Sequence, residues 1–243
     1  MFYPRFFGPR YSYRCGSGVH NLRGGVCGGV TKSDLSLMEH LSGQGKCVLD
    51  AGCGDGHLMK MLINSGYDVT GIDIDIKQLN SASYIGKVVC GDCNYLPFKN
   101  GSFDMVFLIN VLHHVEAPST LVEEISRVLK RRGTMYLSEV TESNPLLRLA
   151  RISHPYWHSS EVKSHMRTEE VKAIIGKKFL QVTEDGDIGT IAWVWYVIGE
   201  RIMSLDVLET AFLSKIVSIV DSILGKASNY RFSCQYNAVC KKR

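Results

Sequence analysis

A strand that turns into a helix through alternating glycines constrains this chain more than any other feature. Residues 48–56 read Val-Leu-Asp-Ala-Gly-Cys-Gly-Asp-Gly, and a helix-forming segment follows. Glycines leave the backbone uncovered, so a ligand can lie directly against it and against the N–H groups that begin the helix. The residues that we expect at this ligand are Asp50, Gly52, Cys53, Gly54 and Gly56.

Three further strand ends carry polar residues. A second apolar strand ends in Asp73 about twenty residues after the first, and a carboxylate there can accept hydrogen bonds from a ribose diol. A third strand leads into Asp92, which can accept the amine proton of an adenine, and a fourth ends at Asn110. This spacing predicts a bound nucleoside.

The glycine spacing also narrows the kind of nucleotide. The dinucleotide-binding fingerprint is G-x-G-x-x-G. This chain has G-x-G-x-G, one residue shorter, with Asp50 two residues before Gly52. A nicotinamide-dependent dehydrogenase therefore fits poorly.

An ordered set of motifs covers roughly residues 45 to 140. They are Leu49-Asp50-Ala51-Gly52-Cys53-Gly54-Asp55-Gly56, Gly71-Ile72-Asp73, Gly91-Asp92, Leu96-Pro97-Phe98 with Ser102-Phe103-Asp104, Asn110-Val111-Leu112-His113-His114, and Arg127-Val128-Leu129-Lys130 before Gly133. In this order the set resembles the class I S-adenosylmethionine-dependent methyltransferases of the small-molecule type, related to the quinone-biosynthesis C-methyltransferases. The ends of the chain match that family poorly, and substrate choice should reside there.

The resemblance implies a role for each matching position toward S-adenosylmethionine. Asp73 would take the ribose hydroxyls and Asp92 the adenine amine, while Ile74 and Cys93 contact the faces of the base. The helix start after the glycines would hold the methionine carboxylate. The remaining contacts would be Asp50 to the ammonium group, and Asn110 and Val111 to the sulfur side.

Histidines are the candidates for a catalytic base, because imidazole titrates near neutral pH. His113 and His114 follow the fourth strand at the mouth of the crevice, where packing or helix capping is the alternative role. His154, His158 and His165 lie in a variable segment and could face the acceptor. For Asp104 we favour a structural role.

Strand and helix patterns alternate through the middle of the chain. We expect strands at 46–50, 68–73, 87–90, 103–109, 134–140, near 180–182 and at 230–239, and helices at 31–41, 56–64, 75–84, 119–130 and 168–178. Such alternation predicts an α/β fold with a doubly wound, mostly parallel seven-stranded sheet. The resemblance adds an antiparallel last strand.

Local signals suggest where two of these helices begin and end. Thr120-x-x-Glu123 reads as a capping box, residues 130–132 are basic as in a last helical turn, and Gly133 reads as a stop. Thr168 reads as the cap of the later helix.

The chain reads as a single methyltransferase-like domain, 31–243, behind an aromatic and glycine-rich segment, 1–30. That segment is either a mobile tail or a lid over the ligands. A helical insertion at 190–226 contains Trp193, Trp195 and an amphipathic helix. It would pack on the domain or form a dimer interface, or else cover an apolar acceptor or contact a membrane surface.

Composition points to no additional chemistry. The net charge of +4 and the absence of a basic stripe do not favour nucleic acid. The eight cysteines show no disulfide framework, and Cys90-Gly91-Asp92-Cys93 lacks the second pair that a zinc site needs. With no signal peptide apparent, we expect a cytoplasmic protein, with peripheral membrane contact as the alternative.

The leading hypothesis is methyl transfer from S-adenosylmethionine to a small, apolar acceptor such as a quinone, an isoprenoid or a lipid-like molecule. Two alternatives stay open: transfer to a tRNA nucleoside, and a non-catalytic cofactor-binding subunit that serves a partner enzyme.

Overall fold

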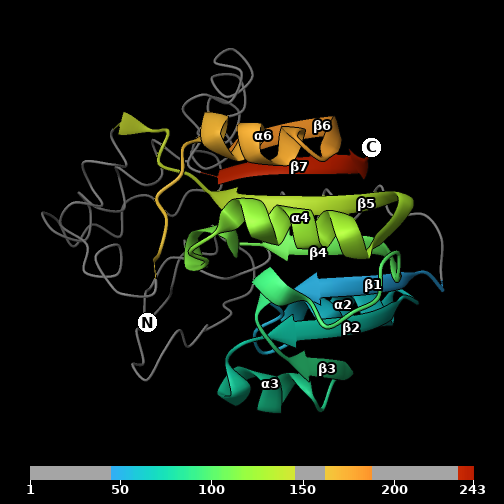
Figure 1. Cartoon of the computed structure of the whole chain (residues 1–243). Coiled ribbons are helices and arrows are strands. Elements are labelled where there is room, and N and C mark those ends of the chain that lie inside the picture. Colours follow the sequence, from blue (N-terminus) through green and yellow to red (C-terminus); the bar gives the residue numbers. More distant parts are fainter. Residues whose placement is uncertain (1–44, 146–161, 188–234) are drawn as a thin grey trace, which may run out of the picture.

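Seven strands form one sheet in the part of the chain that the structure describes. The computed structural model describes residues 45–145, 162–187 and 235–243. The sheet order is β3-β2-β1-β4-β5-β7-β6 (Figure 1). The strands are β1 Cys47–Ala51, β2 Asp68–Asp73, β3 Lys87–Cys90, β4 Phe103–Ile109, β5 Leu129–Val140, β6 Phe179–Asp187 and β7 Gln235–Lys242.

Strand direction confirms the predicted fold class. Each neighbouring pair from β3 to β5 is parallel, and β7 runs antiparallel to both β5 and β6. The order reverses between β1 and β4, and such a reversal opens a crevice at the carboxyl ends of the strands. The predicted site residues follow those ends.

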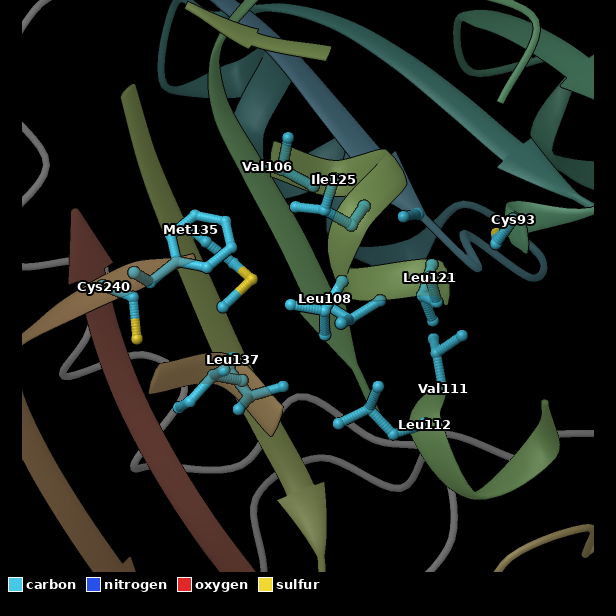
Figure 2. Packing of buried hydrophobic residues seen from close by; sticks show 14 of the residues in the cluster. Cys93, Val106, Leu108, Val111, Leu112, Leu121, Ile125, Met135, Leu137 and Cys240 are labelled. Carbon is cyan, nitrogen blue, oxygen red and sulfur yellow. The ribbon is translucent and has the colours of Figure 1, made fainter. Parts of the chain in front are cut away.

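Helices cover both faces of the sheet (Figure 1). The helices are α2 His57–Asn64, α3 Ile76–Ala82, α4 Pro118–Val128 and α6 Thr168–Gly176, with single 3-10 turns η1 Cys93–Tyr95 and η2 Leu112–His114. On one face, Leu108 of β4 and Leu137 of β5 pack with Leu121 and Ile125 of α4 (Figure 2). On the other face, Phe107 and Tyr136 belong to the same core cluster as the buried residues of α2.

Helix α4 begins earlier than predicted. Ala117 is its N-cap, no side chain caps it, and Pro118 occupies the first turn. The Thr120–Glu123 capping box was therefore a wrong prediction. The fixed φ of proline and its missing N–H suit the first helical position, so the helix starts at Pro118.

The predicted end of the same helix is also wrong. α4 ends at Val128, and residues 130–132 lie within β5, with Arg132 at φ 62°. Glycine is required at position 133 because a side chain would not fit there, and not because it ends a helix. A Cβ there would lie 2.9 Å from both the Leu129 side chain and the Lys130 carbonyl oxygen.

Thr168 is the first residue of α6 rather than its cap, which is Arg167. The Thr168 hydroxyl hydrogen bonds with Ser143 instead. Glu169 and Glu170 lie in the first turn, where acidic side chains suit the positive end of a helix. No helix among the described residues is long and apolar enough to cross a bilayer.

Several predictions fall outside the described residues. They concern the leader 1–30, the helix 31–41, the insertion 190–226, the residues 230–234 of the last strand, and His154 and His158.

Candidate functional site

The glycine turn, residues 52–56, adopts a backbone that side chains disfavour. Gly52, Gly54 and Gly56 have φ values of 78°, 52° and 84°. A Cβ at Gly52 would lie 2.4 Å from Cγ2 of Val111. The N–H groups of Gly52 and Cys53 both donate to the carbonyl oxygen of Ile72, which ties the turn to the end of β2. The turn therefore needs glycine both for its φ and for close approach.

Asp73 joins the ends of two neighbouring strands. Its Oδ2 accepts the N–H of Gly54 at 2.8 Å, and its Oδ1 accepts the N–H of Asp75 at 2.9 Å. A carboxylate has about four lone-pair positions, so both oxygens keep capacity for a ligand hydroxyl. Asp73 therefore fixes the backbone around the glycine turn and can also accept hydrogen bonds from a ligand.

Asp50 is a buried acid with an unsatisfied oxygen. It is 3% exposed, and its Oδ2 has no hydrogen-bond partner. Burial, followed by the charges of Asp73 and Asp55, raises the pKa of Asp50 to about 7. Buried polar atoms in folded proteins are nearly always paired, so an unpaired carboxylate oxygen marks a position for a cationic or proton-donating ligand group.

The start of α2 follows directly on the glycine turn. Its N-cap is Gly56, which provides no capping side chain, and no acid lies in its first turn. Asp55 Oδ1 accepts the N–H of His57 at 3.3 Å. Burial lowers the pKa of His57. Because a helix N-terminus carries partial positive charge, this end favours an anionic group.

The third strand end supplies Asp92 and its neighbours. Asp92 Oδ1 accepts the N–H of Asn94 at 2.8 Å and so caps η1. Ile74 is 73% exposed, whereas Cys93 is buried, and burial raises the pKa of the Cys93 thiol to about 12. Ile74 thus offers an exposed apolar surface, and Cys93 a neutral thiol. The described residues contain no group of three or more potential metal ligands.

One arginine holds the loop after η1. Arg127 donates to the carbonyl oxygens of Leu96 and Phe98 and makes a two-point contact with Glu124. Glu124 in turn accepts the N–H of Leu96 at 2.8 Å. This network fixes the loop that follows Asp92 against α4.

The end of β4 contains a second unsatisfied polar atom. Asn110 has φ 55°, and its N–H donates to the carbonyl oxygen of Ser138 at 2.7 Å. Its buried side-chain oxygen has no partner. Val111 follows and packs against Gly52. The predicted residues of the sulfur side thus lie beside the glycine turn.

A buried glutamate that the sequence analysis missed organises the next turn. Glu139 is fully buried at the end of β5 and accepts the N–H of Leu112 at 2.8 Å. Its other oxygen pairs with Nδ1 of His113 at 2.5 Å and accepts the N–H of Val140. An acid within the apolar run 134–140 was the available signal.

The two adjacent histidines differ in their surroundings. His113 is 4% exposed, while His114 is half-buried, and their rings lie 4.0 Å apart. His165 pairs with Glu142 at 2.9 Å. The glutamate contact gives His113 a fixed ring orientation.

Asp104 has the structural role that we favoured. Its Oδ2 accepts the N–H of Cys47 and pairs with Lys130. Burial opposes ionisation of Asp104, but these hydrogen bonds outweigh it and lower its pKa.

Comparison with known proteins assigns this arrangement to a family. Residues 49–137 match the model of a methyltransferase domain. A chain in the solved complex of the Haloferax volcanii Trm112 methyltransferase activator with a putative methyltransferase has a TM-score of 0.59. It is 20% identical, with 86% of this chain and 88% of that one covered. Residues 49–137 form a class I S-adenosylmethionine-dependent methyltransferase domain.

Two curated relatives match part of this chain. The tRNA U34 carboxymethyltransferase of Campylobacter concisus is 30% identical over 109 residues, which are 42% of this chain and 38% of the relative. The ubiquinone biosynthesis O-methyltransferase of Caulobacter vibrioides is 27% identical over 146 residues, 54% and 58% of the two chains. The chain therefore spans only about half the length of these relatives.

Proposed function

We propose that this protein transfers a methyl group from S-adenosylmethionine to a small acceptor. The observation that carries the proposal is the unpaired, buried oxygen of Asp50 beside the glycine turn. It fits the ammonium group of the cofactor, and the adjacent open start of α2 fits its carboxylate.

The adenosine half would lie across the next two strand ends. Asp73 keeps lone pairs for the ribose hydroxyls, and Asp92 would accept a hydrogen bond from the adenine amine. Exposed Ile74 would cover one face of the base, with Cys93 near the other. The loop network around Arg127 would hold this part of the site in place.

When bound, S-adenosylmethionine supplies an electrophilic methyl group whose former bonding electrons remain on sulfur as a neutral thioether. The chain's own residues therefore need chiefly to align the acceptor and exclude water. Glu139 and His113 would hold the turn that faces the sulfur side. Of the two adjacent histidines, half-buried His114 is our candidate for accepting a proton from an acceptor that must lose one.

Two relatives point to different acceptors. The ubiquinone biosynthesis O-methyltransferase favours a small quinone-like acceptor, which we place first because this relative aligns with 54% of the chain, against 42% for the tRNA enzyme. The tRNA U34 carboxymethyltransferase favours a tRNA nucleoside as the second candidate. A non-catalytic cofactor-binding subunit is the third.

Calorimetric titration with S-adenosylmethionine tests the cofactor, and Asp73→Ala should weaken binding at least 10-fold. Unchanged affinity in that variant would refute the ribose contact. Tritium transfer from labelled cofactor into lipid extract or into tRNA then separates the two enzymatic candidates. If the protein binds the cofactor but labels no fraction, the result would favour the third candidate, a non-catalytic cofactor-binding subunit.

A further inference from the structure

Three polar side chains form a directed hydrogen-bond chain across β5 and β7. Gln235 Nε2 donates to Ser138 Oγ at 2.7 Å, and Ser138 Oγ donates to Asn237 Oδ1 at 2.7 Å. The Ser138 hydroxyl has one hydrogen, so the bond from Gln235 directs it to the amide oxygen of Asn237. The amide nitrogen of Asn237 is then left with two hydrogens and no partner, although Asn237 is 1% exposed.

These side chains lie on the sheet face that also contains Asp50. Side chains alternate along a strand, and Tyr136 belongs to the core cluster of the α2 face. Ser138, two residues later, and Asn237, paired opposite it, share that face. Asp50 does too, because it follows Val48 of the same cluster by two residues.

The hydrogen-bonded side chains of Ser138 and Asn237 also lie level with the glycine turn. Ala51, the last residue of β1, pairs with Leu108, so Gly52 is level with Ile109. Ile109 pairs with Ser138, and Ser138 with Asn237. Asn237 is thus two strand spacings, about 10 Å, from β4 along the carboxyl edge. A small acceptor placed beside Asn110 would span that distance.

The unpaired amide needs a partner, since a buried donor without one is costly. The cofactor that we propose would occupy the ends of β1, β2 and β3, where Asp50, Asp73 and Asp92 lie. The ligand that reaches the ends of β5 and β7 is then the methyl acceptor.

We propose that Asn237 is a specificity-determining residue that donates a hydrogen bond to an oxygen of the acceptor. This inference rests on the proposed function and refines it. The acceptor is not a plain hydrocarbon at the reacting end. It carries a carbonyl, hydroxyl or carboxylate oxygen within a ring's width of the methylated atom, and Ser138 with Gln235 sets the orientation of the amide that recognises it.

The test uses tritiated S-adenosylmethionine as the donor and an extract of the source cells as the acceptor. Asn237→Leu keeps the volume and removes the donor, and Asn237→Ala is a second variant in case leucine impairs folding. Thr134→Val is the control, because Thr134 is a buried, hydrogen-bonded residue on the same face of β5, four residues before Ser138 and farther from the carboxyl edge. Cofactor affinity is measured in parallel by calorimetry.

We expect both Asn237 variants to raise the KM for extract-derived acceptor about 10-fold, equivalent to about 1.4 kcal/mol, with cofactor affinity unchanged. The control should keep the wild-type KM. Wild-type KM in the Asn237 variants, or an equal loss of cofactor affinity, would overturn the inference but leave methyl transfer intact. A wild-type protein that binds no cofactor, or labels no fraction, would overturn the proposed function itself.

Discussion

Replacing Asp50 by asparagine tests whether a buried carboxylate receives the ammonium group of the cofactor. With a pKa of about 7, Asp50 is protonated in about three quarters of the cofactor-free molecules at pH 6.5. An ammonium group beside it would favour the ionised form and lower its pKa. If that pKa falls below about 5, binding should release about 0.7 proton from this group.

Calorimetry in two buffers with different ionisation enthalpies measures this release directly. The asparagine of Asp50→Asn cannot ionise. Cofactor binding at pH 6.5 should therefore release about 0.7 proton less from this variant than from the wild type. At pH 6.5 an α-amino group is already mostly protonated, so the cofactor's own amine adds little to the release in either protein. Equal release from both proteins would refute the proposed contact.

The same acid should affect stability without cofactor. The pKa of Asp50 is about 7 in the folded state, against an ordinary aspartate pKa of 3.8, so the folded state binds more protons between these pH values. The free energy of unfolding should therefore fall as the pH rises from about 4 to about 7, by on the order of 4 kcal/mol. Urea unfolding of Asp50→Asn should lack this contribution.

Two substitutions test the parts of the site that shape it. Gly52→Ala should abolish calorimetric cofactor binding, because φ is 78° and the new Cβ would lie 2.4 Å from Val111. Gly101→Ala has a similar φ of 64° but an open surrounding, and it should bind normally. Glu139→Leu should lower the urea unfolding free energy by about 3 kcal/mol, because it leaves buried donors unpaired. Exposed Glu116→Leu should change it by less than about 0.5 kcal/mol, and equal losses would contradict the role of Glu139.

The residues that follow strand ends were predictable from sequence, because the glycine turn and the acids lie next to recognisable apolar strands. Asp73 illustrates this, since its position alone indicated the crevice. Glu139 was not found because its partner, His113, is 26 residues away and no local pattern joins them. The hydrogen bond between Ser138 and Asn237 spans 99 residues, and only strand pairing reveals it.

The local signals at the two ends of α4 were misread, and for an identifiable reason. Thr120 and Glu123 have the spacing of a capping box, but Pro118 already begins the helix two residues earlier. The basic residues 130–132 suit a helix end by charge, yet pairing with β4 draws the segment from Leu129 onward into β5. Local charge and capping signals were weaker than proline geometry and sheet formation.

The position of β7 determines when the sheet can be completed during synthesis. Within the described residues, β6 joins the sheet solely through β7, which the ribosome produces some fifty residues later. At typical elongation rates, that interval lasts roughly 2 to 10 s. During it, Leu180 and Val182 belong to a strand whose neighbour has not yet been made, so its unpaired edge is open to pairing with other chains.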